Sequence, residues 1–567
     1  MTQPSTFALR RNDRIVFLGD SITEQQLYTN YVETYLSTRY PELKLTFLNA
    51  GWGGDTAPGG AQRLDRDVLA LRPTLVTICY GMNDGRYVPP AEEIRATFVA
   101  GMRELASRLK AAGVRIVLLT PGMVDEAVAP NLGEVQYNRK GLRILADEVL
   151  ALAAREGLPV ADLHMLMNEV YDRARAADPK FYMSDGVHPD PAGHLVMAFG
   201  LLTALGVPPR RQSLAVDLEK RKVSASPELR VRGLKRNPYG FSVDVQFDRL
   251  PFYVEPAARK VLPFLPFQET FNELRISVRG LTASRGYFRS EALRSASIPR
   301  LDLESGVNLF SQWAIGSMQQ AETIHRFTLE KDQIYYKAWR NLGLNGTNSS
   351  YHNARAHAAG IQLMQVLERG RARLLAGRPA LTCALNVVTT DMPGEPLQSG
   401  DFISQWSLLG PFPKPFETDK LDGEAAFAAQ PPKLAGNWLA AELDLAIPGS
   451  NLIQAFGQQT DCFAYAVTLI RSPVEQAAEL LIGSDDGAAA WLNGVQVLQN
   501  LAVNRPLSPD QERLQVQLRH GDNVLLLKIT QGQSAWGMCA RFSGLQKPVA
   551  AVRPDSAGRT DFPVRSP

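Results

Sequence analysis

The chain has 567 residues, of which 45% are hydrophobic and 21% charged, and its formal net charge is +3. This composition is ordinary for a folded globular protein, and the length predicts three or four domains. Because both charge signs are interspersed and form no basic stripe, we do not expect nucleic acid as a partner. No apolar run is long enough to cross a bilayer, so we also expect no membrane span.

The first 207 residues alternate between short apolar runs and stretches with helical spacing. We expect strands at 14–18, 44–48, 74–79, 114–119 and 158–162. We expect helices at 24–39, 60–71, 92–112, 134–156, 163–177 and 192–205. This alternation predicts an α/β domain whose parallel sheet is covered by helices on both faces.

A polar motif follows the first predicted strand. Gly19-Asp20-Ser21 ends that strand, and Ser21 and Glu24 have the spacing of a capping box at the start of a helix. Ser21 would then lie at the carboxyl end of a strand, where open parallel sheets bind ligands. The alternative is a serine that only caps the helix.

Three later stretches complete a pattern with this motif. They are Asn49–Thr56 and Gly81–Asp84, which each follow a predicted strand, and Asp185–Pro189, which precedes a helix. Together with Gly19–Ser21 they resemble, in order and separation, the four blocks of the SGNH (GDSL-type) hydrolase family. The resemblance covers roughly the first 205 residues. It implies a flavodoxin-like order of five strands.

The resemblance also implies roles for individual residues. Ser21 would be the nucleophile, His188 the general base, and Asp185 the group that orients the imidazole. The oxyanion hole would consist of the Ser21 N–H, the Gly54 N–H and the Asn83 side-chain amide. The chemistry agrees, because a serine hydroxyl needs a neighbouring base and the tetrahedral intermediate needs donors already in place.

Other polar residues near these blocks have less specific expectations. Asp20, Asp84, Arg63 and Trp52 would support the site or contact the substrate. We prefer His188 to His194 as the base because only His188 has an aspartate at the family position, and we expect His194 on the surface or behind the site.

We expect no cofactor and no catalytic metal. The weak metal candidates are Asp485 and Asp486, whose paired hard oxygens would suit calcium, and the alternative is a tight acidic turn between strands. The four cysteines are far apart and show no metal spacing, so we expect reduced thiols, with a Cys462–Cys539 disulfide as the alternative.

The chain changes character after the first domain. Residues 207–232 are polar and basic and are interpreted as a linker or an edge, whereas 241–247 alternate as a half-buried strand does. The helical stretch that follows would cover the crevice or act as a spacer. We expect a hydrolase domain, a small β-sandwich, a helical region, a β jelly-roll and a tail at 8–207, 208–305, 306–395, 396–547 and 548–567 respectively.

The last third is rich in predicted strands. Asn493-Gly494 between apolar runs predicts a hairpin. The stretch from Ser484 to Gly494 is similar to jelly-roll domains of the galactose-binding and protective-antigen types. Because such domains often accompany carbohydrate-active enzymes, the similarity implies a glycan as a possible partner.

The sequence thus predicts a serine ester hydrolase that works through an acyl-enzyme on a small-molecule or oligosaccharide ester. A carbohydrate O-acetylesterase is the preferred form. The alternatives are a lipase or thioesterase acting on longer acyl chains and a non-catalytic carbohydrate-binding protein. The first residues contain no apolar signal region, which predicts a cytoplasmic protein, or a periplasmic or secreted one if a signal was removed.

Overall fold

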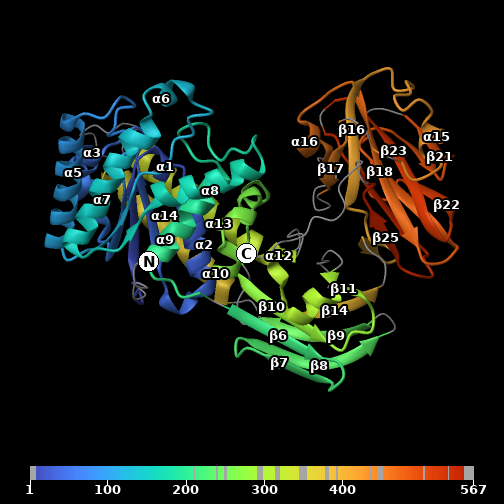
Figure 1. Cartoon of the computed structure of the whole chain (residues 1–567). Coiled ribbons are helices and arrows are strands. Elements are labelled where there is room, and N and C mark those ends of the chain that lie inside the picture. Colours follow the sequence, from blue (N-terminus) through green and yellow to red (C-terminus); the bar gives the residue numbers. More distant parts are fainter. Residues whose placement is uncertain are drawn as a thin grey trace.

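The computed structural model covers the whole chain (Figure 1). The structure describes residues 8–209, 211–237, 240–247, 252–289, 298–312, 319–343, 354–376, 382–390, 394–432, 434, 437–443, 451–501, 505–533 and 535–554.

The N-terminal part is built on a five-stranded parallel sheet with the order β2-β1-β3-β4-β5. The strands are β1 (Arg14–Gly19), β2 (Thr46–Gly51), β3 (Leu75–Cys79), β4 (Arg115–Leu119) and β5 (Val160–Ala161). This is the flavodoxin-like order that the family resemblance implied, so that prediction is confirmed. Since β1 lies between β2 and β3, the segments after these three strands meet at one edge of the sheet.

Helices cover both faces of this sheet (Figure 1). Alternate residues of β1 show why: Ile15 and Phe17 enter one apolar cluster, and Val16 and Leu18 enter the other. The helices and helical turns are α1 (Ser21–Glu24), α2 (Leu27–Arg39), η1 (Pro41–Leu43), α3 (Ala57–Gln62), α4 (Leu64–Asp67), η2 (Leu69–Leu71), α5 (Glu92–Ala111), α6 (Pro130–Glu134), η3 (Tyr137–Leu142), α7 (Arg143–Glu156), α8 (Leu163–Ala177) and α9 (Pro191–Ala204).

The next part of the chain is a β region made of two sheets. One has the order β13-β10-β6-β7 and the other β12-β11-β14-β9-β8. The strands are β6 (Arg211–Asp217), β7 (Lys222–Ala225), β8 (Leu229–Asn237), β9 (Gly240–Phe247), β10 (Glu273–Arg279), β11 (Arg285–Arg289), β12 (Ile298–Pro299), β13 (Val307–Asn308) and β14 (Thr382–Thr390). Of the two interpretations of 207–232, the linker was wrong, because Leu214 and Val216 of β6 alternate into the core of this region. The edge is confirmed for β7 and β8, since each is the last strand of its sheet.

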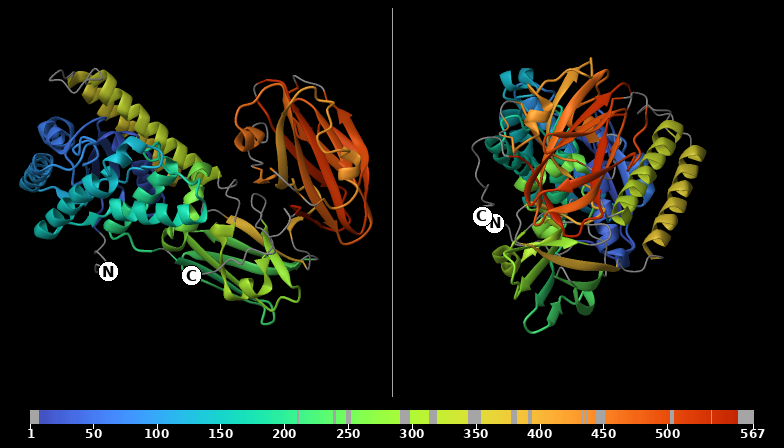
Figure 2. Two further views of the ribbon diagram at one scale, coloured as in Figure 1. Left: turned by 45° about the horizontal axis from the view of Figure 1, so that its top comes forward. Right: turned by 90° about the vertical axis from the view of Figure 1, so that its right-hand side faces the viewer.

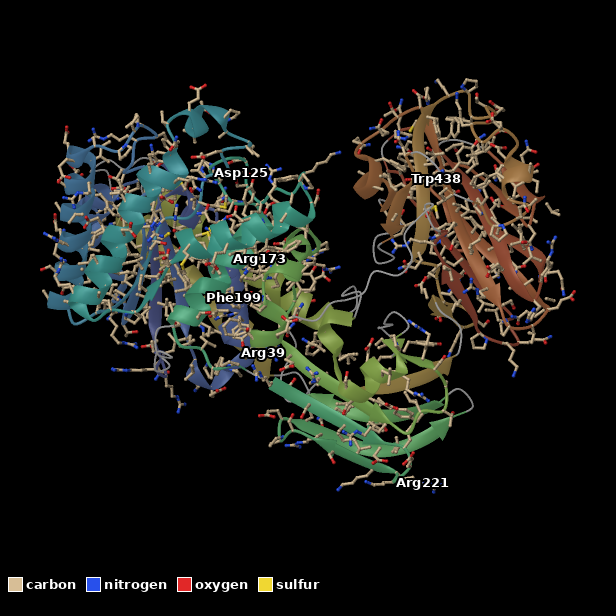
Figure 3. The ribbon with its side chains drawn as sticks, viewed as in Figure 1. Arg39, Asp125, Arg173, Phe199, Arg221 and Trp438 are labelled. Atoms are coloured by element: carbon tan, nitrogen blue, oxygen red, sulfur yellow. The ribbon has the colours of Figure 1, made fainter. Side chains whose placement is uncertain are left out.

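Two short helices join the β region to the catalytic part, η4 (Pro256–Phe264) and α10 (Phe267–Phe271). Two others, α11 (Arg300–Ser305) and α12 (Leu309–Gln312), pack on β10 within the β region. Phe199 of α9 packs against Phe271, with ring centroids 5.4 Å apart. Arg39, at the end of α2, donates a 2.5 Å hydrogen bond to Asn272. Figure 3 labels Phe199 and Arg39 on this side of the catalytic part.

Two long helices, α13 (Gln319–Tyr336) and α14 (Ala354–Ala376), lie side by side along the catalytic part (Figure 2). The π-helical segment η5 (Lys337–Gly343) continues α13. Tyr335 and Trp339 enter the same apolar cluster as Leu48 and Ala50 of β2, so these helices cover the otherwise open edge of the sheet.

The C-terminal part is antiparallel and lies apart from the catalytic part in Figure 1. Its strands are β15 (Glu395–Leu397), β16 (Gln405–Pro413), β17 (Leu439–Glu442), β18 (Cys462–Ser472), β19 (Gln476–Ser484), β20 (Ala488–Leu492), β21 (Val495–Asn500), β22 (Glu512–Leu518), β23 (Gly521–Gln531), β24 (Met538–Ser543) and β25 (Val549–Val552), and its helices are α15 (Glu424–Phe427) and α16 (Asn451–Phe456). They form an eight-stranded sheet and a three-stranded sheet. The jelly-roll topology and the domain boundaries stay predictions.

Two details of the C-terminal part bear on the sequence analysis. The Asn493-Gly494 hairpin is confirmed, because β20 and β21 pair directly across it. The segment expected as a tail begins with β25, which pairs with β15 and β18.

Cys462 and Cys539 are buried free thiols, as is Cys79. None of the described helices is long and apolar enough to cross a membrane.

Candidate active site

Ser21 lies at a tight turn between β1 and α1. Asp20 is the N-cap of α1, and its carboxylate accepts a hydrogen bond of 3.0 Å from the Ile22 N–H. The proposed Ser21–Glu24 capping box was therefore wrong, because the residue before the serine does the capping. A glycine is needed at position 19, since a Cβ there would lie 2.2 Å from the Thr23 hydroxyl and 2.7 Å from the Cys79 carbonyl oxygen.

The Ser21 hydroxyl does not cap the helix and instead contacts the ring of His188. Its Oγ lies 3.0 Å from His188 Nε2, and His188 Nδ1 lies 3.2 Å from Asp185 Oδ2. The structure thus brings together three residues that are up to 167 positions apart in the sequence. Base, orienting acid and hydroxyl stand in the order that activates a serine.

Asp185 is held by its own turn. Its other carboxylate oxygen accepts hydrogen bonds from the Val187 N–H at 3.0 Å and the His188 N–H at 2.7 Å. Partial burial opposes ionisation, but these bonds and the His188 ring outweigh it and lower the pKa of Asp185. The Asp185 side chain is 65% exposed and that of His188 is 36% exposed.

The turn is braced from two sides. The Asp125 N–H donates a 2.9 Å hydrogen bond to the Gly186 carbonyl. Asp190 caps α9 through the Ala192 and Gly193 N–H groups, and it also accepts a 2.6 Å hydrogen bond from Lys260 of η4. The histidine turn is therefore anchored both to the 123–127 loop and to η4.

The hydrogen-bond donors predicted for the oxyanion hole lie at the turn after β1 and in the loops after β2 and β3. Gly54 follows β2 with a φ of +74°, a conformation that favours glycine. Neither the Ser21 N–H nor the Gly54 N–H donates a hydrogen bond to any residue that the structure describes. The Asn83 amide donates one hydrogen bond of 3.0 Å to the Asp55 carbonyl, which leaves its second N–H available.

Tyr87 orients that amide and was missed in the sequence. Its hydroxyl donates a 3.0 Å hydrogen bond to Asn83 Oδ1, so the NH₂ group must face the other way. Burial raises the pKa of Tyr87 to about 12, so the hydroxyl keeps its proton. Nothing in the spacing of the motif signals this tyrosine.

A buried network lies beneath the serine turn. Arg63 donates to Asp55 Oδ2 at 2.8 Å, to the Tyr80 hydroxyl at 2.9 Å and to the Gly19 carbonyl at 3.2 Å. The Tyr80 hydroxyl donates to the same Asp55 oxygen at 2.7 Å. One arginine therefore links the residue before the serine turn to the residue after Gly54.

The remaining predicted site residues are all buried, with exposures of 2% for Asp20, 3% for Arg63, 6% for Trp52 and 8% for Asp84. Asp84 accepts from the Ala57 and Gly81 N–H groups and so joins two of the loops. Burial and nearby carboxylates raise the pKa values of Asp20 and Asp84 to about 7. All four are placed to hold the frame of the site.

His194 is not on the surface. It is fully buried, its Nε2 lies 2.8 Å from Gln25 Oε1, and its Nδ1 accepts a hydrogen bond of 3.3 Å from the Tyr28 N–H. Burial, reinforced by the charge of His188, lowers the pKa of His194 to about 3, so it stays neutral. It supports α1 and α2 from behind.

No group of three or more histidine, cysteine, aspartate or glutamate side chains is arranged to hold a metal in the part of the chain that the structure describes. Asp486 accepts hydrogen bonds from the backbone N–H groups of Arg505 and Gly532. The acidic turn at Asp485-Asp486 thus connects loops of the C-terminal part. Burial and the neighbouring Asp486 raise the pKa of Asp485 to about 6.

A cavity of about 700 Å³ lies on the other side of Asp125, between the 123–127 loop, η3 and α8. Figure 3 labels Asp125 at this place. The lining of the cavity includes neither Ser21 nor His188. This cavity is therefore separate from the Ser21–His188–Asp185 chain.

The sequence profile of the GDSL-like lipase/acylhydrolase family matches residues 17–196. These residues form a GDSL-type acylhydrolase domain. The chain is accordingly a carboxylic ester hydrolase. The matched range begins in β1 and ends within α9, so it contains Ser21, Gly54, Asn83, Asp185 and His188.

Two relatives cover this domain. An acetylxylan esterase of Geobacillus stearothermophilus is 27% identical over 217 residues, which are 34% of this chain and 94% of the relative. An isoamyl acetate-hydrolyzing esterase of Saccharomyces cerevisiae is 24% identical over 213 residues, 34% of this chain and 86% of the relative.

The fold is shared beyond this domain. The structure of a gut microbial diltiazem-metabolizing enzyme aligns with 68% of this GDSL-type chain and 99% of its own, at a TM-score of 0.56 and 22% identity. This structure aligns with 68% of the present chain, whereas the acetylxylan esterase aligns with 34%. The similarity in fold therefore extends past residue 196.

Proposed function

We propose that this GDSL-type hydrolase is a carbohydrate O-acetylesterase whose nucleophile is Ser21. The observation that carries the proposal is the hydrogen-bonded chain from Ser21 through His188 to Asp185. It is supported by the N–H groups of Ser21 and Gly54, which donate no hydrogen bond within the described part of the chain. The acetyl preference is supported by the relatives, since both are named for acetate esters. A carbohydrate as the alcohol part of the ester is supported by the acetylxylan esterase.

In this mechanism the Ser21 hydroxyl attacks the ester carbonyl and passes its proton to His188 Nε2. The oxyanion accepts hydrogen bonds from the Ser21 N–H, the Gly54 N–H and the free N–H of Asn83. His188 then gives its proton to the leaving alcohol, and an acetyl–Ser21 ester remains. Water attacks this ester with His188 again acting as base, which releases acetate and restores Ser21.

Asp185 acts through the histidine. Its carboxylate faces Nδ1, which keeps the proton on that nitrogen and leaves Nε2 free to accept from Ser21. A carboxylate with a lowered pKa also stabilises the imidazolium that forms during attack.

The test is hydrolysis of p-nitrophenyl esters from acetyl to decanoyl by the wild type and Ser21→Ala. We expect the acetyl ester to react fastest and kcat to fall by about 10⁴-fold or more in the variant. A preference for long chains would replace the proposal by a lipase or thioesterase. Equal rates for wild type and variant would overturn the hydrolytic role of Ser21.

The alcohol is tested next. Acetylated xylo-oligosaccharides and simple alkyl acetates, compared by kcat/KM, separate a carbohydrate esterase from a general acetate esterase. We expect the sugar esters to be preferred, and an equal or lower kcat/KM on them would remove the carbohydrate from the proposal.

We also propose that the C-terminal β region binds glycan. Trp406, Trp491 and Trp536 are buried, so none of them can stack on a sugar. Trp438, labelled in Figure 3, is only half-buried and stacks on Phe427 with centroids 5.6 Å apart. Loss of oligosaccharide binding in Trp438→Ala, with Trp491→Phe as a control, is the expected result, and unchanged binding in Trp438→Ala would remove this residue from the proposal.

A further inference from the structure

The helical pair α13 and α14 is fixed to the catalytic domain by buried charge. Lys331 is fully buried, and its Nζ lies 2.8 Å from Glu368 and 3.0 Å from Asp332 and also contacts Glu33 of α2. Arg371 of α14 donates to Glu33 at 2.5 Å. A buried network of this kind holds its members in one arrangement because any unpaired charge would be costly.

The same helices reach the serine turn. Arg340, in η5, pairs with Glu24 Oε1, and its guanidinium lies 3.5 Å from the centroid of the Trp52 ring. The Tyr336 hydroxyl donates a 2.7 Å hydrogen bond to the same Glu24 oxygen. The Trp339 ring meets Trp52 edge to face at 6.1 Å.

The two groups that Arg340 touches flank the proposed oxyanion hole. Glu24 lies one turn after Ser21 on α1. Trp52 stands two positions before Gly54, and its N–H donates a 3.0 Å hydrogen bond to the Gly19 carbonyl. Glu24 also lies against the loop itself, since a Cβ on Gly53 would be 2.7 Å from Glu24 Oε2.

This contact is largely shielded from solvent. The Arg340 side chain is 13% exposed and that of Glu24 is 21% exposed. A charge-assisted hydrogen bond combined with stacking on an indole face fixes a guanidinium more firmly than a solvent-exposed ion pair does. Arg340 thus joins the helix that begins at Ser21 to the loop that carries Gly54.

We propose that Arg340 is a positioning residue for the oxyanion hole, and that the helical pair is therefore a working part of the hydrolase. The inference rests on the proposed function, because it needs the Ser21 and Gly54 N–H groups to receive the oxyanion. Arg340 lies outside residues 17–196, so the family match does not include it. It acts through Glu24 and Trp52 and not by touching the ester.

The test compares Arg340→Ala with Arg326→Ala. Arg326 is an arginine of α13 whose side chain is 72% exposed and paired with Glu322, so it is a matched control. On p-nitrophenyl acetate, we expect Arg340→Ala to lower kcat by about 10- to 100-fold, because small shifts of the reacting groups have effects of this size. Since an oxyanion contact forms only in the transition state, we expect KM to change by less than about threefold.

Two further variants separate positioning from folding. Arg340→Lys keeps a cation for Glu24, so it should recover part of kcat. Arg340→Ala combined with Glu24→Ala should lose little more than either single variant, because both remove one connection. Titration of reactive serines with a fluorophosphonate counts the folded sites, and kcat is expressed per titrated site.

The outcomes are distinct. If Arg340→Ala retains the kcat of Arg326→Ala, or if its loss disappears when kcat is expressed per titrated site, the positioning role is overturned. If the loss lies in KM alone, Arg340 binds substrate and the proposal is also overturned. If wild type and Ser21→Ala hydrolyse the ester equally, the proposed function itself fails.

Discussion

The serine half and the histidine half of the candidate site are held in different ways. Ser21 and Gly54 stand on a buried frame in which Arg63 joins Gly19, Asp55 and Tyr80. His188 stands on a turn whose aspartate is 65% exposed. The proposed oxyanion donors of Ser21 and Gly54 are thus supported by buried residues, whereas the proposed base, His188, lies next to solvent.

The two halves also differ in their carboxylates. Burial raises the pKa of Asp20, next to the serine, to about 7, whereas backbone N–H groups and the imidazole lower that of Asp185 despite its partial burial. The environment of Asp20 therefore favours its protonated form, whereas that of Asp185 favours its carboxylate form. The predictions below test this contrast between the two halves.

The largest effect should follow removal of the proton carrier. His188→Ala leaves Ser21 without a base, so we expect kcat on p-nitrophenyl acetate to fall by about 10⁴-fold or more. The exposed His520 provides the control, and His520→Ala should leave kcat unchanged. A loss below about tenfold would show that another base serves Ser21.

Breaking the frame should cost stability more than any other single change in it. Arg63→Met leaves Asp55 buried without its cation, whereas Asp67 keeps Arg66, so we expect the free energy of unfolding to fall by about 3–5 kcal/mol. Arg103→Met, on the exposed side of α5, should change it by less than about 0.5 kcal/mol. Urea denaturation measures both, and equal values would refute the frame.

A smaller effect is expected at the rim. In Asp185→Asn the amide can donate to Nδ1 and favour the wrong imidazole tautomer, but water at this exposed position can compete. We expect kcat to fall by about 100-fold, less than in His188→Ala. Asp172→Asn, an exposed residue of α8, is the matched control, and a loss as large as that of His188→Ala would contradict the contrast.

The last prediction concerns the stability of the fold as a function of pH. The folded protein keeps a proton on Asp20 up to about pH 7, whereas the unfolded chain loses it near 3.8, so this contribution to stability disappears as the pH rises through 7. Asp20→Asn cannot lose a proton, and its amide oxygen can still accept from the Ile22 N–H.

Above pH 7, the wild type should therefore have lost about 4 kcal/mol relative to Asp20→Asn, compared with their difference at pH 4. Thermal unfolding of both proteins from pH 4 to 8 measures this slope. Parallel curves would show that Asp20 is ionised throughout, and Asp84, whose pKa is also about 7, should contribute the same residual slope to both.

Local patterns in the sequence were sufficient for much of the fold and for the candidate triad. The alternation of strands and helices predicted the parallel sheet, and Asn493-Gly494 predicted the hairpin. Both predictions were possible because these features depend on residues that are close together in the sequence. Ser21 and His188 were found through motifs that stand where strands and turns end.

What was missed depends on contacts between distant segments. The Glu24–Arg340 pair joins residues 316 positions apart, and no spacing rule connects them. For His194 the sequence left the surface and a place behind the site open, and the packing of α9 against α2 shows that it lies behind the site. Leu214 and Val216 did carry a signal, since their alternation marks β6, but the surrounding charges led to the interpretation as a linker.

The late position of α14 has a consequence for synthesis of the protein. Glu33 belongs to a helix made near the start of translation, while its partners Lys331 and Arg371 are added some three hundred residues later. A chain emerges from the ribosome N-terminus first. Until α13 and α14 have been synthesised, the β2 edge of the nascent hydrolase domain is therefore uncovered and Glu33 has no Lys331 or Arg371 to pair with. Chaperones that shield open sheet edges would find their target in this interval.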